Sequence, residues 1–491
     1  MAQINWTGKG IDHKWSTQSN WDSKALPGDT DDAVICWRDD AYEYEPLIDT
    51  NTKVQSLTLG AEEQTARLEI TAGFEIQNDL IVGGIDAAQL EVHGNAVTLK
   101  VSGDITVGNT NDEAKLWLHS GAQLQQDSSK SISIGSAEDG AGFLIGADAG
   151  TGATTGDVTV GDAGIGLAMF STSATLSSKT ITLGASATGH GTLTTTTTGT
   201  VTADALIIGG AGTGTVNLGA GATLTVNGSV TIAQENASTG TFTFGGATVT
   251  EAPGSFSATE LKFGKGSGTV AFNHDKTIAA PFVCEAKISG NGTLEVKAGV
   301  TQIKGDCSEF TGGALVDAKG TLILPETSLT GQIKVASNGK LVGPGTIQDL
   351  DLSGILYTSI AAHESNKSKD SYEQSNVLVS GNSKTGGGAI HLSVELGDDD
   401  SKADLVHFAG NLTYAGNVSV YFNIIEGSEG AQTDYGIKII TVDGGAAGAD
   451  FVLGRPDVFD PNDGGPALIA GKYLYELVAK GNDLVLISKL K

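Results

Sequence analysis

Short apolar segments that end in glycine recur along the first half of the chain. In each segment two apolar residues flank a middle residue, most often threonine, and a glycine follows. Seven copies occupy residues 57–60, 80–83, 105–108, 132–135, 158–161, 181–184 and 206–209. Their glycines are 23 to 27 residues apart, and 230–232 continues the series with Ala233 in the glycine position. Regular spacing of this kind indicates an internal structural repeat.

The alternation inside each segment predicts a β-strand with one buried and one exposed face. Side chains two residues apart point to the same side of a strand, so we expect Ile105 and Val107 to face the core and Thr106 to face water. Two further strand-like pieces, 89–92 and 97–101, lie between successive copies and are bounded by turn residues. Each repeat therefore holds three short strands.

These features predict an all-β fold, a single-stranded right-handed parallel β-helix (β-solenoid), with about 25 residues and three short strands per rung. One rung cannot bury its apolar face alone, whereas stacking the next rung about 4.8 Å away pairs the backbone and covers the core. Glycine suits the corners, where the chain turns with positive φ. The prediction requires the seven glycine-terminated segments to lie in register along one sheet.

The repeat continues past residue 240, with phenylalanine entering the predicted core. Residues 240–244, 268–272 and 292–296 keep the alternation. A local rung of about 23 residues would stack Cys284 and Cys307 on adjacent rungs, at a separation compatible with a disulfide. Two buried thiols, or one buried and one exposed thiol, are equally consistent with the sequence.

The two ends differ in composition from the repeat and predict caps. Four of the five tryptophans lie in the first fifty residues, which are also rich in tyrosine and aspartate; the residues are Trp6, Trp15, Trp21, Trp37, Tyr42, Tyr44, Asp29, Asp31 and Asp32. We expect 1–52 to form an aromatic cap on the first rung, with an exposed sugar-stacking surface as the alternative. The solenoid is assigned to 53–395 and a C-terminal cap to 396–491.

Composition and charge narrow the function classes. With 39% hydrophobic and 18% charged residues, the 491-residue chain is too apolar for a disordered polymer. Its net charge of −28 disfavours nucleic acids and anionic lipids as partners. No run of 18 apolar residues occurs, so we expect no direct membrane insertion. The N-terminus lacks the features of a signal peptide, so we expect either a trimmed precursor or another route of export.

Motifs for catalysis or metal binding are not found in the sequence. Serine-hydrolase, phosphate-loop and HExxH patterns are missing, and the eight histidines are scattered from His13 to His407. Acidic turns with oxygen ligands that calcium could use occur at Asp398, Asp399, Asp400, Asp460, Asn462 and Asp463. They lack the spacing of a calcium loop, and we interpret them as solvated loops; 363–375 reads as a further exposed loop. We therefore assign no catalytic, cofactor or metal residues and expect no cofactor.

Several segments resemble bacterial autotransporter passengers. Residues 6–8, 20–21, 27–29 and 32–35 resemble the start of secreted β-solenoid proteins, and 292–347 resembles the autotransporter-associated β-strand repeat. The last hundred residues are similar to the pertactin-type autochaperone region, at 401–406, 436–445, 451–453, 473–477 and 483–486. The resemblance implies a region that caps the last rungs and nucleates folding. That family places a membrane β-barrel after it, and we expect a passenger without its barrel, since the chain stops at Lys491.

We expect a non-catalytic extracellular or cell-surface passenger that acts as an adhesin or a surface rod. Its expected partners are a ligand on a host or neighbouring cell, which includes glycans, or another copy of itself. Two alternatives stay open: a structural subunit of a virion or extracellular filament, and a polysaccharide-active β-helix enzyme. The enzyme would need two carboxylates, or a carboxylate and a cation, that converge on one exposed face.

Overall fold

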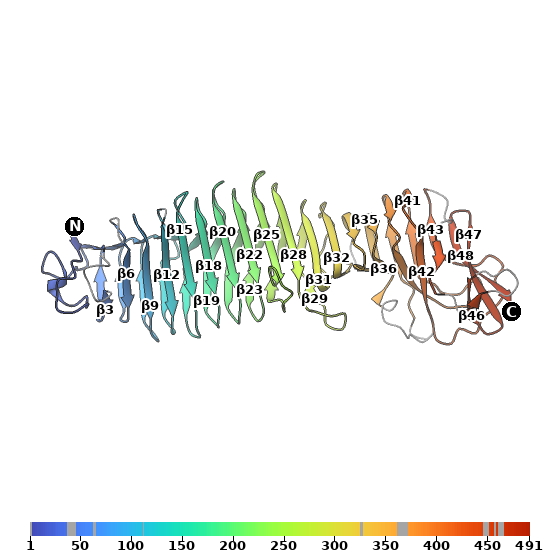
Figure 1. Cartoon of the computed structure of the whole chain (residues 1–491), viewed down its shortest axis with the longest axis horizontal. Helices are drawn as coiled ribbons and strands as arrows, with labels where there is room; N and C mark the ends of the chain where they lie inside the picture. Colours follow the sequence, from blue (N-terminus) through green and yellow to red (C-terminus); the bar gives the residue numbers. More distant parts are fainter. Residues whose placement is uncertain are drawn as a thin grey trace. The chain divides into compact units, whose positions relative to one another are not determined.

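The computed structural model describes residues 2–36, 46–61, 65–110, 112–324, 328–360, 372–444, 451–455, 458–459 and 466–491. The chain divides into two units, Met1–Asn273 (unit 1) and His274–Lys491 (unit 2). In both units short strands stack in parallel, coil upon coil, which confirms the predicted β-solenoid (Figure 1). Right-handed winding stays the expectation for parallel crossover connections.

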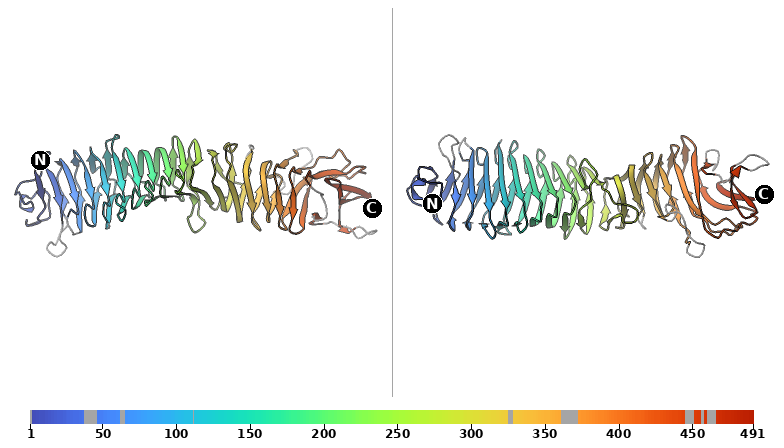
Figure 2. Two further views of the ribbon diagram at one scale, coloured as in Figure 1. Left: turned by 90° about the horizontal axis from the view of Figure 1, so that it is seen from above. Right: turned by 60° about the horizontal axis from the view of Figure 1, so that its bottom comes forward.

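Most coils of unit 1 hold three strands, as the repeat predicts. In one coil β6 (Ala66–Ile70) is followed by β7 (Phe74–Ile76) and β8 (Leu80–Val82). The next coil repeats the order with β9 (Ala88–His93), β10 (Thr98–Val101) and β11 (Ile105–Val107). These pair in parallel as β6 with β9, β7 with β10 and β8 with β11. Figure 2 shows the same stacking from two further sides.

The first strand of each coil belongs to one sheet of unit 1, here called sheet I. Besides β6 and β9, its strands are β3 (Leu47–Ile48), β12 (Glu113–His119), β15 (Ala141–Gly146), β18 (Ile165–Phe170), β20 (His190–Thr195), β22 (Thr213–Leu218), β25 (Thr239–Gly245) and β28 (Ser267–Asn273).

The other two strands of each coil make up sheet II. Besides β7, β8, β10 and β11, its strands in unit 1 are β1 (Gln3–Asn5), β2 (Asp32–Ile35), β4 (Thr52–Val54), β5 (Ser56–Leu59), β13 (Gln123–Gln126), β14 (Ser131–Ile134), β16 (Gly152–Thr154), β17 (Asp157–Val160), β19 (Thr175–Leu183), β21 (Thr200–Ile208), β23 (Thr223–Val226), β24 (Ser229–Ile232), β26 (Ser255–Ser257) and β27 (Glu260–Phe263). In β19 and β21 the two strand positions merge into one longer strand.

The seven glycine-terminated segments lie in register along sheet II, as predicted. Their first apolar residues are successive partners, in the order Leu57, Leu80, Ile105, Ile132, Val158, Ile181 and Leu206. All seven are at most 1% exposed, and the middle residues between the apolar pairs are half-buried on the outer side. The glycines that follow have φ between +63° and +79°, the corner conformation that glycine adopts without strain.

Phenylalanine fills the core towards the end of unit 1, again as predicted. Phe242, Phe244 and Phe272 are fully buried. The rings of Phe242 and Phe244 stack at 4.3 Å between centroids, and those of Phe244 and Phe272 at 5.3 Å. Phenylalanine therefore takes the place of aliphatic residues in the core of these coils, and the strands stay in register.

Unit 2 has parallel pairing of its own. Its strands are β29 (Phe282–Cys284), β30 (Lys287–Ser289), β31 (Thr293–Ile303), β32 (Gly313–Ile323), β33 (Leu329–Val335), β34 (Lys340–Val342), β35 (Gly345–Leu352), β36 (Ile355–Tyr357), β37 (Asn376–Val379), β38 (Ser383–Thr385), β39 (Ala389–Val394), β40 (Leu405–Phe408), β41 (Leu412–Tyr414), β42 (Val418–Ile424), β43 (Ile437–Val442) and β44 (Phe451–Leu453). Its coil length varies more widely than that of unit 1. Leu341 pairs with Leu356 and Leu350 pairs with Ser383, so the second of these coils is more than twice as long as the first.

Cys284 and Cys307 are both buried and no disulfide joins them, so the alternative of two buried thiols holds. Cys284 pairs with Ile303 and not with Cys307, so the local coil is shorter than the disulfide required. Burial raises the pKa of each thiol to about 12. The disulfide that the sequence left open as one alternative required a coil length that this part of the chain does not have.

Antiparallel strands follow the last parallel coil of unit 2. They are β45 (Val458–Phe459), β46 (Pro466–Ala470), β47 (Tyr473–Lys480) and β48 (Asp483–Leu490). β46, β47 and β48 pair in sequence, and β48 also pairs with β43. The edge of β43 is thereby covered, which protects it from pairing with other chains.

The predicted boundaries at 53 and 395 stay predictions. Parallel pairing extends beyond both, because β1 pairs with β2 and β42 pairs with β44. Within the described ranges, the chain forms no helix with the length and apolar character that a membrane crossing needs.

Candidate functional site

The described tryptophans of the N-terminal region, Trp6, Trp15 and Trp21, form a buried cluster, in line with a cap and not with a sugar-stacking surface. Trp15 and Trp21 are 1% exposed and Trp6 is 5% exposed. Trp21 makes edge contacts with Trp6 at 5.1 Å and with Trp15 at 4.5 Å, and Trp15 reaches Phe74 of β7. The Trp21 indole N–H donates to the Trp15 carbonyl at 3.1 Å. Trp37, Tyr42 and Tyr44 lie outside the described residues.

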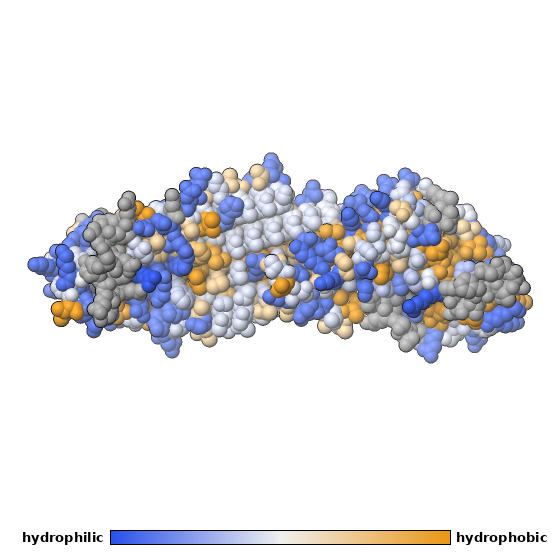
Figure 3. Space-filling view, in the orientation of Figure 1, coloured by the Kyte–Doolittle hydropathy of each residue, from blue (hydrophilic) through white to orange (hydrophobic). Residues whose placement is uncertain are grey.

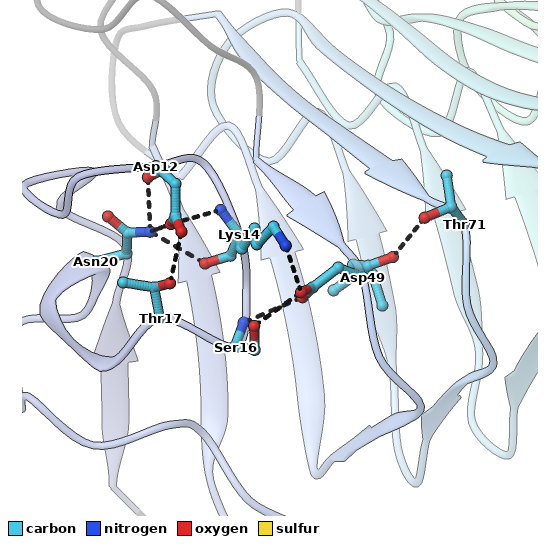
Figure 4. A network of polar contacts seen from close by, with 8 residues as sticks. Asp12, Lys14, Ser16, Thr17, Asn20, Asp49 and Thr71 are labelled. Atoms are coloured by element: carbon cyan, nitrogen blue, oxygen red, sulfur yellow. Dashed lines mark hydrogen bonds and ion pairs between the residues drawn. The ribbon is translucent and has the colours of Figure 1, made fainter.

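A polar network holds the loops of this cap together (Figure 4). The buried Asn20 side chain donates to the carbonyls of Asp12 and Lys14 at 2.9 and 3.0 Å. Asp49 accepts from the Ser16 hydroxyl at 2.8 Å and lies 3.8 Å from the Lys14 ammonium. Each of these side chains has a partner within the cap, so the network stabilises the first coil and leaves no converging set of polar groups for a ligand.

The outer face of sheet I changes character along unit 1. In β6, β9 and β12 its outward positions are mainly charged or aromatic, and in β12 they include Trp117 and His119. The His119 ring stacks on His93 at 4.5 Å, and His93 Nδ1 lies 3.5 Å from Glu69. Glu69 and Glu91 are register partners on this face. Charged and aromatic side chains therefore occupy the N-terminal end of the face.

From β15 onward the outward positions of sheet I carry no Asp, Glu, Lys or Arg. We call the following set the neutral face: Ala141, Phe143, Ile145, Ile165, Leu167, Met169, His190, Thr192, Thr194, Thr213, Thr215, Asn217, Thr239, Thr241, Ser267 and Thr269. Its first two strands are apolar and the next four are rich in threonine. Figure 3 shows hydrophobic colour where Figure 1 labels β15 and β18, beside a pale band over β20 to β25.

Sequence reasoning missed the apolar part of the neutral face. The alternation predicted polar outward residues, but Phe143, Ile145, Leu167 and Met169 are half-buried on the outer side and Ile165 is 58% exposed. The signal was present: in 141–146 and 165–170 both alternating sets are apolar or small. Only the strand register shows that the outward sets of the two strands are neighbours.

Asp404 is the centre of a buried cluster in unit 2. The side chain is 0% exposed, and its carboxylate accepts hydrogen bonds from the hydroxyls of Thr358 and Tyr372 and from the backbone N–H groups of Ser375 and Ser393. Burial raises the pKa of Tyr372, and the negative charge of Asp404 raises it further. The Tyr372 hydroxyl therefore stays protonated and donates its hydrogen bond to Asp404. Thr358 follows β36, Tyr372 and Ser375 precede β37, Ser393 lies in β39 and Asp404 precedes β40. The cluster therefore joins four segments of unit 2.

Asp399, one of the acidic-turn residues, also accepts hydrogen bonds from the backbone of another loop. Its carboxylate accepts from the N–H groups of Asp434, Tyr435 and Gly436 at 2.6 to 3.1 Å. Desolvation raises the pKa of Asp399, but these hydrogen bonds outweigh it and hold the pKa below its ordinary value. The contact fastens the 398–400 turn to the loop before β43. Asp460, Asn462 and Asp463 lie outside the described residues.

The Tyr475 side chain of β47 makes a second set of hydrogen bonds between segments in the same region. The side chain is buried, and its hydroxyl lies 2.7 Å from the Gly397 carbonyl and 2.8 Å from the Ala431 N–H, which donates to it. The antiparallel strands are thus tied to the turns of the last parallel coils.

Among the described residues, no group of three or more His, Cys, Asp or Glu side chains has the geometry to hold a metal ion. His274 is buried with Nε2 3.0 Å from the Thr301 hydroxyl, and burial lowers its pKa to about 4, so the ring is neutral. His407 pairs with Asp443 at 2.8 Å. These histidines have partners within the protein. Of the 363–375 segment, residues 363–371 lie outside the described residues.

Comparison with known proteins places the Asp404 cluster in a recognised domain. A family model described as autochaperone domain type 1 matches residues 349–477, which include Asp399, Asp404 and Tyr475. The chain is also similar to the adhesin BmaC autotransporter of Brucella suis biovar 1 (strain 1330), with 31% identity over 195 residues. Together these two matches support an autotransporter passenger domain. The similar segment covers 40% of this chain and only 5% of the length of BmaC.

The matched domain covers part of the stretch over which unit 2 departs from the regular coils of unit 1. The autochaperone match begins in β35 and spans the long coil between Leu350 and Ser383, the Asp404 cluster, β45, β46 and part of β47. The sequence-based resemblance of the last hundred residues to an autochaperone region is therefore confirmed, and the matched region begins earlier, at residue 349.

Proposed function

We propose that this passenger acts as an adhesin on the outside of a bacterial cell and has no catalytic activity. The observation that carries the proposal is its similarity to an autotransporter adhesin over 195 residues, together with the autochaperone match. The passenger spans a small part of that relative, so its own binding activity is inferred from the family and from its exposed faces.

The regular coils of unit 1 support a binding role. A parallel stack presents its outward side chains in rows about 4.8 Å apart, on faces that the backbone holds rigid. Such a surface suits contact with an extended partner more than with a small substrate. The proposed partner is a ligand on a host or neighbouring cell surface.

Fluorescent beads that carry the purified passenger test this proposal. We expect the beads to bind cultured host cells or bacteria, with saturation and with competition by the soluble passenger. Beads coated with albumin are the control. Binding no stronger than that of the control beads to every cell type tested would contradict the proposal.

A screen against uronic-acid polysaccharides tests the non-catalytic part separately. We expect no release of unsaturated sugars. Release that is abolished by Glu91→Gln would make the stacked Glu69 and Glu91 pair part of an enzyme active site and would overturn this part of the proposal.

A further inference from the structure

The neutral face of sheet I is an uncharged surface on a strongly acidic protein. The chain has a net charge of −28. Copies that approach each other through acidic faces therefore repel one another, and the repulsion extends about 10 Å at 0.1 M salt. From β15 to β28 the outward positions of sheet I contribute nothing to this repulsion, since they include no acidic or basic side chain.

The first half of the neutral face also gains free energy when it is covered. Phe143, Ile145, Leu167 and Met169 form two adjacent apolar rows, and Ile165 at their edge is 58% exposed. Contiguous apolar side chains that stay partly exposed at the surface mark interaction sites on soluble proteins. Burial of apolar surface would contribute about 25 cal/mol per Å².

The regular rows of the neutral face suit a partner that has the same row spacing. Parallel strands place the rows about 4.8 Å apart, and two sheets that pack face to face interdigitate at about 10 Å. A second copy of the chain offers the identical spacing. It also offers an uncharged surface of the same shape, which a two-fold symmetric contact requires.

We propose that two copies of this passenger pack neutral face against neutral face. This inference rests on the proposed presentation at a cell surface and names a second copy as one partner. Six strands spaced by about 4.8 Å, with two or three outward residues each, cover on the order of 400 Å² per copy, about half of what a stable interface buries. Each contact is therefore weak, and many contacts between two crowded surfaces act together.

Bead clumping measures this interaction directly. Beads that carry the passenger should clump with one another, and clumping should increase when salt is raised from about 20 to about 300 mM, because salt screens the repulsion outside the neutral face. Ile165→Asp places a charge on the face in both copies, so it should lower clumping at least about tenfold. Thr192→Asp, in the threonine half, should also lower it.

Ile85→Asp is the matched control, since Ile85 is 52% exposed and lies outside the neutral face. Both isoleucines are exposed, and thermal unfolding of each variant checks that the fold is intact. Clumping of Ile165→Asp beads at the wild-type level, or no clumping of wild-type beads at any salt concentration, would overturn the inference.

The two proposals fail in different ways. Wild-type beads that bind cells but do not clump would leave the adhesin proposal standing and remove the second copy as a partner. Beads that clump through the neutral face but bind no cell would support the self-contact and contradict binding to other surfaces.

Discussion

At the residue scale, the corner after each glycine-terminated segment shows how one backbone angle selects a residue type. Seven coils have glycine there, and Ala233 takes the same place with φ of +54°. An alanine in this region costs about 1 to 2 kcal/mol relative to a relaxed backbone. The repeat therefore tolerates one strained corner, while most corners need glycine for a second reason, the close approach of the next coil.

Gly161 and Ala233 provide opposite tests of this explanation. A Cβ on Gly161 would lie 2.2 Å from the His190 carbonyl carbon, so Gly161→Ala should lower the free energy of unfolding by about 3 kcal/mol, from strain and overlap together. Ala233→Gly relieves strain but makes the unfolded chain more flexible, so it should change stability by less than about 1 kcal/mol. Urea unfolding measures both, and equal losses in the two variants would contradict the argument.

Asp399 makes the stability of unit 2 depend on pH. Its pKa is lowered in the folded protein, so its contribution is fully present above the unfolded pKa of about 3.9 and is lost as pH falls through the folded pKa. Asp399→Asn should unfold at lower urea concentration than the wild type at pH 7, and the difference should shrink towards pH 2. Asp400→Asn, on the exposed neighbour in the same turn, should show neither effect. A constant difference from pH 7 to pH 2 would contradict the assignment.

At the element scale, Asp404 joins segments that no local pattern connects. Its four donors come from residues 11 to 46 positions away in the chain. Removing the carboxylate would leave several buried donors without an acceptor, which is costly because each lost its hydration on folding. We infer that this cluster fixes how β36, β37, β39 and β40 stack within the autochaperone region.

A graded pair of variants tests the Asp404 cluster. Asp404→Asn places an amide N–H₂ against a backbone N–H and should destabilise unit 2 by about 3 kcal/mol or more. Tyr372→Phe removes one donor and leaves three, so it should cost about 1 to 2 kcal/mol. Urea unfolding followed by far-ultraviolet circular dichroism would report both losses, since all five tryptophans lie in unit 1. Equal and small effects would show that the cluster is not needed for stability.

The strands that the sequence predicts well are those whose alternating pattern is contained within one strand. In 89–92 and 97–101 the alternation is local to each strand, and β9 and β10 form there. In unit 2 one coil can be twice as long as another, because loops of different size leave the stack between paired strands. A fixed repeat length of about 23 residues therefore put Cys307 opposite Cys284, whereas Ile303 lies there.

At the scale of the whole molecule, the C-terminal strands decide whether unit 2 ends in an exposed edge. Deleting 396–491 would remove β40, β41 and β42, the partners of β37, β38 and β39. Unpaired edges promote aggregation during folding. We expect the truncated chain to refold slowly or to aggregate after dilution from urea, with the full chain refolded in parallel as reference. An unchanged yield of soluble protein would contradict a capping role for this region.

The sequence by itself determined the stacked all-β fold, the strands of unit 1, their inward residues and the glycine corners. Each of these depends on residues a few positions apart, through the two-residue alternation and the positive φ at a corner. Only the tertiary structure decided that Phe143, Leu167 and the threonine rows form one uncharged face, that Asp404 has four donors, and that no disulfide joins the two buried cysteines. These features depend on which coil lies beside which, and the register between coils is set by loop lengths and packing that no local pattern encodes.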